Sequence, residues 1–391
     1  MSTSDVYLDE HVFDGGPPLR LQRSLGLVQP DEPHVVKRAV LAAVIAWLPL
    51  ALLTTAQTIL FADGSVVSFF RDFGGYARYL IAVPALFLAE SDCIPRLEAI
   101  VRQFVNTGLI TSRDLPRYHR AVASTRRLLD STYGDLVAVV VSYVAVFALA
   151  LYISPEMVPA WQRGGPGRFS LAGWWNCCIS LPMLLILFFG WLWRLVLWAR
   201  FLVLVAALDL QLLPSHPDHA GGLKFVSSSL RGFRLISLGL GAVVAGAIAN
   251  RVIYHHQDLL SFKAPLIGLL AFLLVVFAGP LTVFVPKLRR TKTRGTFVYG
   301  AFANRLGREF EAKWLTANEK GANLEMLEAP DFSATTDYYA ITATVYAIRD
   351  LPFNTKDLIG PLVPGLIPFL FVALSTIPAH VVLDSIIKLL L

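Results

Sequence analysis

The chain has 391 residues, of which 55% are hydrophobic and 16% are charged, and its formal net charge is +6. A soluble domain has about 25% charged residues, so this composition excludes an ordinary soluble protein. Several apolar runs reach the ~20 residues that cross a hydrocarbon core, which predicts an all-α, polytopic membrane protein embedded in a lipid bilayer. Lysine and arginine lie mostly between the apolar runs, as membrane topology requires, which argues against nucleic acid as a partner.

The predicted elements follow in chain order. Residues 1–34 form an irregular cytoplasmic arm without periodicity. Residues 35–286 form a six-span region with cytoplasmic helical extensions at 91–134 and 201–232. Residues 287–357 form a basic cytoplasmic helical region, and residues 358–391 a last transmembrane helix that prolines break. The seven predicted spans are 39–60, 73–90, 136–153, one within 171–213, 233–254, 265–285 and 358–380.

The distribution of basic residues predicts the orientation. Lysine and arginine are far more numerous in the N-terminal segment 1–34 and after the second, fourth and sixth spans than in the opposite set of loops. By the positive-inside rule, the N-terminus then lies inside and the C-terminus outside. The ionisable residues near the spans all fall at predicted edges, where snorkelling or an interfacial position explains them: Arg78, Glu90, Arg194, Arg200 and Asp209.

The fourth apolar run, 171–213, is too long for one straight crossing. Trp174 and Trp193 stand nineteen residues apart, or ~28 Å of helix, and fit the two interfacial aromatic belts. The remainder of the run either continues as one long helix or folds back. If it continues, it must be covered by other protein, and the amphipathic extension of the second helix is the expected cover.

A turn rich in His, Asp and Gly follows the fourth run and carries His216, Asp218, His219, Gly221 and Gly222. Two histidines and a carboxylate suggest a metal site, proton chemistry, or a gate for a ligand or ion. The favoured interpretation is structural: Pro214 ends the fourth helix, Asp218 caps the fifth, and the glycines permit a tight turn. No Walker loop, dinucleotide fingerprint, GxSxG or HExxH motif is present, so no cofactor is predicted and an enzyme is not favoured.

The fifth span carries a seam of small residues spaced by four: Ser237, Gly241, Ala245 and Ala249, followed by Asn250. Small residues at this spacing allow two helices to approach closely in a membrane. Helix packing is the favoured interpretation, and a pore lining the alternative. Association through this seam would produce a homo-oligomer.

The run His216-Pro217-Asp218-His219-Ala220-Gly221-Gly222-Leu223 resembles HPDxAGGL, a motif of uncharacterised bacterial multi-pass membrane proteins. A second stretch resembles another block of this group and includes Pro330, Asp331, Ser333, Arg349 and Pro352. The two blocks cover roughly a tenth of the chain, and Lys224 departs from the small residue expected there. The resemblance implies a bacterial inner-membrane location and carries no activity with it.

Three functions follow as hypotheses. The preferred one is an oligomeric channel or facilitator for small ions. The first alternative is a membrane enzyme or metal-binding protein that uses His216, Asp218 and His219. The second is a non-conducting scaffold that binds a cytoplasmic partner. The motif turn and the second block are expected to meet at the cytoplasmic face, and anionic lipid headgroups are expected at basic segments such as residues 115–130.

Overall fold

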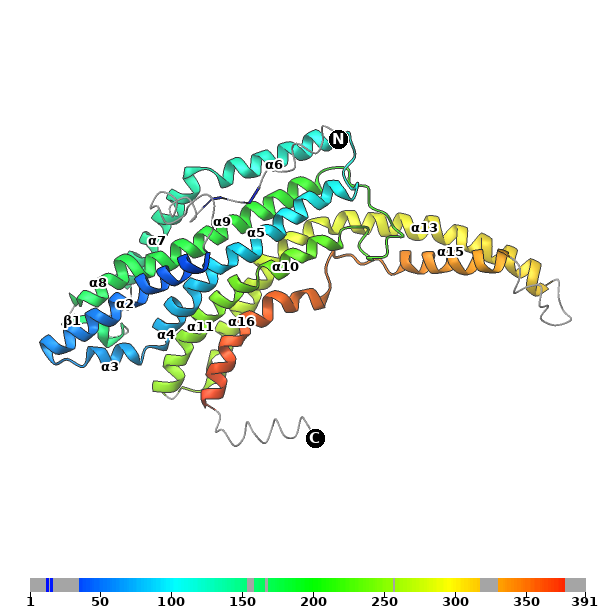
Figure 1. The fold of residues 1–391 in the computed structure, drawn as a ribbon. Helices are drawn as coiled ribbons and strands as arrows, with labels where there is room; N and C mark the ends of the chain where they lie inside the picture. Colours follow the sequence, from blue (N-terminus) through cyan, green and yellow to red (C-terminus); the bar gives the residue numbers. More distant parts are fainter. Residues whose placement is uncertain are drawn as a thin grey trace.

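The computed structural model describes residues 12–13, 15–16, 35–152, 158–165, 168–255, 257–316 and 330–376. Most of these residues are helical, and the two strands, β1 (Arg163–Gly165) and β2 (Arg168–Phe169), pair as a short hairpin. The predicted all-α class is confirmed. Figure 1 shows a bundle of long helices with α3 (Ser65–Phe70) and β1 at one end and a helical hairpin projecting from the other.

Six helical segments in the described residues are long and apolar enough to cross a membrane: Val35–Phe61, Thr132–Tyr152, Leu171–Ala206, Arg234–Tyr254, Lys263–Trp314 and Thr355–Ser375. Helices α2 (Val35–Phe61), α7 (Thr132–Tyr152) and α16 (Thr355–Thr376) expose large aliphatic side chains along their lengths. Such exposure suits a helix that faces lipid tails. The chain therefore has the helices of a multi-pass membrane protein.

The second predicted span is the buried centre of the bundle. Residues 73–90 belong to one continuous helical segment made of α4 (Phe73–Tyr76), η2 (Ala77–Ala82) and α5 (Val83–Asn106). Tyr79, Ala82 and Leu86 are buried against α2 and α11 (Arg234–His255). This segment is not among the six, because Arg78 and Glu90 make it less apolar than its neighbours.

The fourth apolar run is one long helical segment that does not fold back. It comprises α8 (Leu171–Trp175), η5 (Asn176–Ser180) and α9 (Leu181–Ala206). It ends at Ala206, so the interpretation that Pro214 ends this helix is wrong. Residues 208–213 continue instead as non-helical chain, held by the Gln211 amide, which donates to Leu109 O at 2.8 Å.

The apolar end of α9 is covered as expected. Phe201 and Val205 are fully buried. The ring of Phe201 lies 6.4 Å from that of Phe104 on the amphipathic extension of α5. Helix α6 (Leu115–Leu129) packs along the other side of α9, where its Tyr118 ring lies 6.0 Å from Phe201.

Helix α16 covers the small-residue seam of α11. A Cβ atom on Gly241 would lie 2.0 Å from Gly365 O, and one on Gly365 would lie 2.5 Å from Ser237 Oγ. Ser237, Ala245 and Ala249 are buried. Helix packing is thus what these residues do, and α16 of the same chain occupies the seam.

Helix α16 is bent and not broken. It runs without interruption from Thr355 to Thr376 although Pro361, Pro364 and Pro368 lie inside it, and Figure 1 shows the bend. The rest of the predicted last span, 377–380, lies outside the described residues.

The sixth span leads into a projecting arm. Helix α12 (Lys263–Leu273), η8 (Leu274–Ala278) and η9 (Gly279–Phe284) continue into α13 (Val285–Phe310) and η10 (Glu311–Thr316). Helix α15 (Pro330–Tyr346) packs beside α13, and the two form the arm in Figure 1. Tyr346 and Tyr339 reach over Gly300 and Gly307, where a Cβ would lie within 2.6 Å of each hydroxyl.

We expect Gly241→Leu to destabilise the protein strongly, because the added side chain must displace the backbone of α16. Overpacking of this kind typically costs about 1–3 kcal/mol. The measurement is the thermal unfolding midpoint of the purified chain in detergent. Gly268→Leu is the matched control, since a Cβ on Gly268 meets nothing within 4 Å. Equal midpoints for the two variants would contradict the packing of α11 on α16.

Candidate functional site

The motif turn is folded around the carboxylate of Asp218. Its Oδ1 accepts hydrogen bonds from the amides of Ala220 (2.8 Å) and Gly222 (3.1 Å), and its Oδ2 accepts one from Lys224 (3.1 Å). His216 Nδ1 lies 2.9 Å from Oδ1. The carboxylate therefore closes the turn and caps η6 (Lys224–Ser227), and does not cap the fifth long helix as the sequence suggested.

The backbone of this turn requires its glycines. Gly221 and Gly222 have φ angles of 64° and 94°, in the left-handed region that residues with a Cβ rarely adopt. His219 also lies in this region, with φ 54°. The predicted role of Gly221 and Gly222 in a tight turn is confirmed.

The same hydrogen bonds set the charge state of Asp218. Partial burial alone would raise its pKa, but the amides of Ala220, Lys224 and Gly222, together with His216, lower it below the usual 3.8. Asp218 is therefore a carboxylate at neutral pH, and both of its oxygens accept hydrogen bonds from backbone amides of the turn.

The turn and part of the second block meet, as predicted. The Arg349 amide donates to His219 O at 2.9 Å. Lys224 Nζ pairs with Asp357 Oδ2 at 2.5 Å, and Asp357 also accepts from the Asn354 amide at 2.7 Å. We call this contact between residues 215–224 and 349–357 the motif joint. Lys224, the departure from the motif, forms the salt bridge that ties the turn to α16.

The rest of the second block lies elsewhere. Pro330 is the first residue of α15, and Ser333 is exposed one turn later. Pro352 is buried and belongs to the 349–357 part of the motif joint. By contrast, α15 separates Pro330 from Tyr346 by ~24 Å of helix. The side chain of Asp331 lies outside the described part of the structure. Pro330 and Ser333 therefore belong to the tip of the arm.

A metal site at the turn is not supported. The described residues, which include His216, Asp218 and His219, contain no group of three His, Cys, Asp or Glu that could hold a metal ion. His219 adopts a left-handed backbone, and its carbonyl holds the second block. The geometry of the turn is that of a structural joint.

A buried charge cluster joins three long helices, α2, α5 and α9, and was not predicted from the sequence. Arg38 Nη2 lies 3.2 Å and Arg194 Nη1 3.8 Å from the carboxylate of Glu90, and all three side chains are less than 8% exposed. Arg194 also donates to Gly15 O at 2.6 Å and lies over the Trp191 ring. The snorkelling interpretation of Glu90 and Arg194 is wrong, because these side chains point into protein.

A second polar cluster lies near the opposite end of the bundle. Asn250 Nδ2 donates to Asp72 Oδ1 at 2.7 Å, and Asn250 Oδ1 accepts from the Phe73 amide at 2.9 Å. Trp161 Nε1 donates to Asp72 Oδ2 at 3.1 Å, and Arg78 Nη2 lies 3.5 Å from the same oxygen. Asn250 is a packing residue between α11 and α4, so the pore-lining interpretation of this residue is not supported.

Comparison of the chain with protein-family models, with curated proteins and with solved structures finds no match. The function must therefore be argued from the geometry of this chain.

We expect Asp218→Ala to destabilise the motif joint by about 1–3 kcal/mol, because the turn amides lose their acceptors. The Asp218→Asn variant tests whether the negative charge of this carboxylate stabilises the fold. Since the pKa of Asp218 is lower in the folded protein, its ionised form stabilises the fold above the ordinary carboxyl pKa of 3.8. This contribution disappears as the pH falls through the lowered folded value.

The unfolding midpoint measured from pH 7 to pH 3 should therefore fall less steeply for Asp218→Asn than for the wild type. Asp337→Asn, which removes an exposed carboxylate of α15, is the control and should behave as the wild type does. Parallel pH curves for the wild type and Asp218→Asn would rule out this role of the carboxylate.

Proposed function

We propose that this protein is a membrane-embedded scaffold whose α13–α15 arm binds an acidic cytoplasmic protein. In this proposal seven helices cross a bacterial inner membrane, with the N-terminus inside and the C-terminus outside. The seventh crossing is the buried α4–η2–α5 segment. The resemblance of the motif turn supports the location, and the excess of Lys and Arg in alternate loops supports the orientation.

The arrangement of the bundle agrees with this topology. Helix α6, which carries Arg117, Arg120, Arg126 and Arg127, lies at the same end as the basic arm in Figure 1. The opposite end holds α3 and β1, in segments with few basic residues. A positively charged end is the cytoplasmic end under the positive-inside rule.

The main support for this proposal is one exposed face of α13 in the arm. Positions 290, 294, 297, 301, 305 and 308 of α13 recur every three or four residues and so lie along one side of the helix. Arg290 and Arg294 precede Phe297 on this side, Arg305 and Arg308 follow it, and Val298 lies next to Phe297. Phe297 is 74% exposed and Val298 59% exposed. We call this surface the basic–aromatic face.

Lipid tails do not account for this exposure, because the face belongs to a helix that carries five basic residues between Lys287 and Arg294 and projects from the bundle. No described carboxylate lies within ion-pairing distance of Arg290 or Arg294. Exposed aromatic and arginine side chains are the residues that most often dominate binding at protein interfaces. A partner with an acidic surface around an apolar pocket complements both features.

A channel for small ions is less well supported. Its candidate lining residues on α11 lie against α16, and Asn250 binds Asp72 and the Phe73 amide. The enzyme alternative rests on His216, Asp218 and His219, which form no metal-binding group. The exposed basic–aromatic face is the observation that favours a scaffold over both.

We expect a photo-crosslinking amino acid at Phe297 to capture one acidic cytosolic protein in membranes that contain the full chain. The same probe at Thr336, an exposed position on α15, serves as the positional control. The charge reversals Arg290→Glu and Arg294→Glu together should abolish the adduct. The matched reversals Arg113→Glu and Arg127→Glu, outside the arm, should preserve it.

The purified adduct partner should bind the wild-type chain more weakly as salt increases, because exposed charge contacts are screened. A crosslink to a second copy of this chain, to lipid alone, or to a protein whose capture survives the arm reversals would overturn the proposal.

A further inference from the structure

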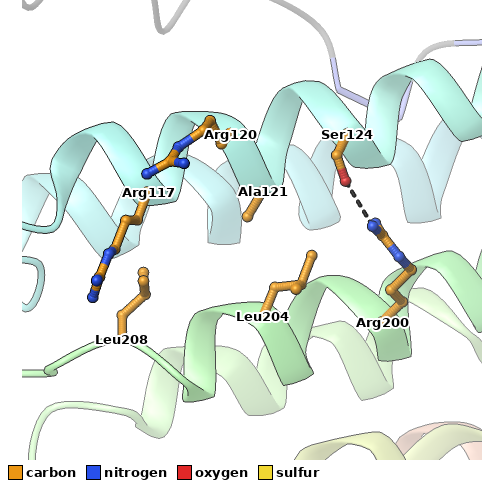
Figure 2. Close-up of a pocket in the computed structure, with 7 residues that line it drawn as sticks. All are labelled: Arg117, Arg120, Ala121, Ser124, Arg200, Leu204 and Leu208. Carbon is orange, nitrogen blue, oxygen red and sulfur yellow. Dashed lines mark hydrogen bonds between the residues drawn. The ribbon is translucent and has the colours of Figure 1, made fainter.

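A groove between α6 and α9 collects three arginines around an apolar floor. Arg117, Arg120, Ala121 and Ser124 line it from α6, and Arg200, Leu204 and Leu208 line it from α9 and its C-terminal end. Its volume is about 320 Å³, within the size range of small-molecule sites. Figure 2 shows Arg117 and Arg120 toward one end of the groove and Arg200 at the other, with Leu204 between them.

The positive charge of this groove is only partly balanced. Arg117 Nη1 lies 3.3 Å from Asp114 Oδ1, and the other oxygen of Asp114 accepts from the Asp209 amide at 2.9 Å. Asp114 is thus fully engaged and offsets one of the three guanidinium charges. Arg120 Nε makes only a long contact, 3.4 Å, with Pro116 O. No carboxylate is among the described residues that line the groove.

Arg200 is the residue that points to a ligand. Its Nη2 donates to Ser124 Oγ at 2.8 Å, which fixes the guanidinium against α6. Its Nη1 is buried and has no hydrogen-bond partner among the described atoms. A buried charged donor without an acceptor is costly, so this group favours an anion that would complete it. Arginine forks match the oxygen geometry of phosphate particularly well.

We propose that the α6–α9 groove binds a phosphate-bearing anion, either the phosphorylated headgroup of an anionic lipid or a free phosphate compound. Arg200 binds the phosphate oxygens with the help of Ser124, and Arg120 and Arg117 neutralise the rest of the charge. Leu204 contacts the carbon part of the ligand next to the phosphate, and Leu208 lies at the Arg117 end of the groove. This site is separate from the basic–aromatic face of the arm, so it goes beyond the proposed scaffold.

The position of the groove relative to the bilayer favours the lipid headgroup over a free phosphate compound. With the proposed topology, Trp193 marks the inner interface and Arg200 lies seven residues, or ~10 Å of helix, beyond it. That position is level with lipid headgroups, whose anionic forms attract basic residues near the membrane. Arg117 and Leu208 lie farther from the membrane, on the cytoplasmic side, and contact only the part of a headgroup beyond its phosphate.

The test is a ligand titration of the purified full chain in neutral detergent, read as the thermal unfolding midpoint and as bound ligand by native mass spectrometry. The probes are dihexanoyl phosphatidic acid, glycerol 3-phosphate and inorganic phosphate, with dihexanoyl phosphatidylcholine as the zwitterionic control. We expect saturable stabilisation by phosphatidic acid. The Arg200→Gln and Arg120→Gln variants should each raise the apparent Kd by about tenfold or more.

Arg127→Gln is the matched control, because it removes the same charge from an exposed position of α6 outside the groove. Arg120 is exposed, so its variant folds even if Arg200→Gln does not. Ser124→Ala keeps every charge and should weaken binding by misplacing Arg200. Stabilisation by glycerol 3-phosphate and inorganic phosphate equal to that by phosphatidic acid would identify a free phosphate compound.

Absence of binding to all three phosphate probes would overturn the proposal. Equal losses of affinity in Arg120→Gln and Arg127→Gln would do so as well, since the charge of the whole helix and not the groove would then be responsible.

Discussion

A carboxylate buried between two guanidinium groups is the constraint on which the packing of this bundle depends. Glu90 on α5 lies 3.2 Å from Arg38 of α2 and 3.8 Å from Arg194 of α9. Removing one partner of such a group leaves an uncompensated buried charge, which costs far more than the pair itself contributes. The three helices must therefore remain in register at this level. The cluster selects one arrangement of apolar helices that could otherwise slide past one another.

On the other side of α5, close approach of helix backbones also keeps the helices in register. Helix α11 lies between η2 and α16, and it has small residues on both faces. Gly246 faces Ala77, whereas Gly241 faces Gly365. Because lipid provides no hydrophobic force between helices, such packing and the polar contacts of Asn250 must hold α11 in place. A helix packed on both faces in this way is a structural core of the bundle.

The sequence predicts the helices well and their partners poorly, for physical reasons. Apolar runs reveal spans by composition, and the excess length of the 171–213 run correctly required a protein cover. Hydropathy cannot tell a lipid-facing edge from a protein interior, so Glu90 and Arg194 looked interfacial. The spacing of Ser237 and Gly241 predicts a close neighbour without saying that it is α16. The three groove arginines stand on two helices more than seventy residues apart, so only the fold brings them together.

The motif joint explains how an arm can act as a rigid part of a membrane protein. Helix α13 continues from the bundle, and α15 returns to the joint, where the Arg349 amide holds His219 O and Lys224 holds Asp357. Both ends of the hairpin are thus anchored. Phe297 lies ~18 Å along α13 from Val285, and the helix leads away from the bundle. At the distance of Phe297, and of Arg305 and Arg308 beyond it, salt screens most of the attraction to headgroups. With the proposed topology, these distal arginines suit a protein partner, while Arg200, close to Trp193, remains within reach of lipid.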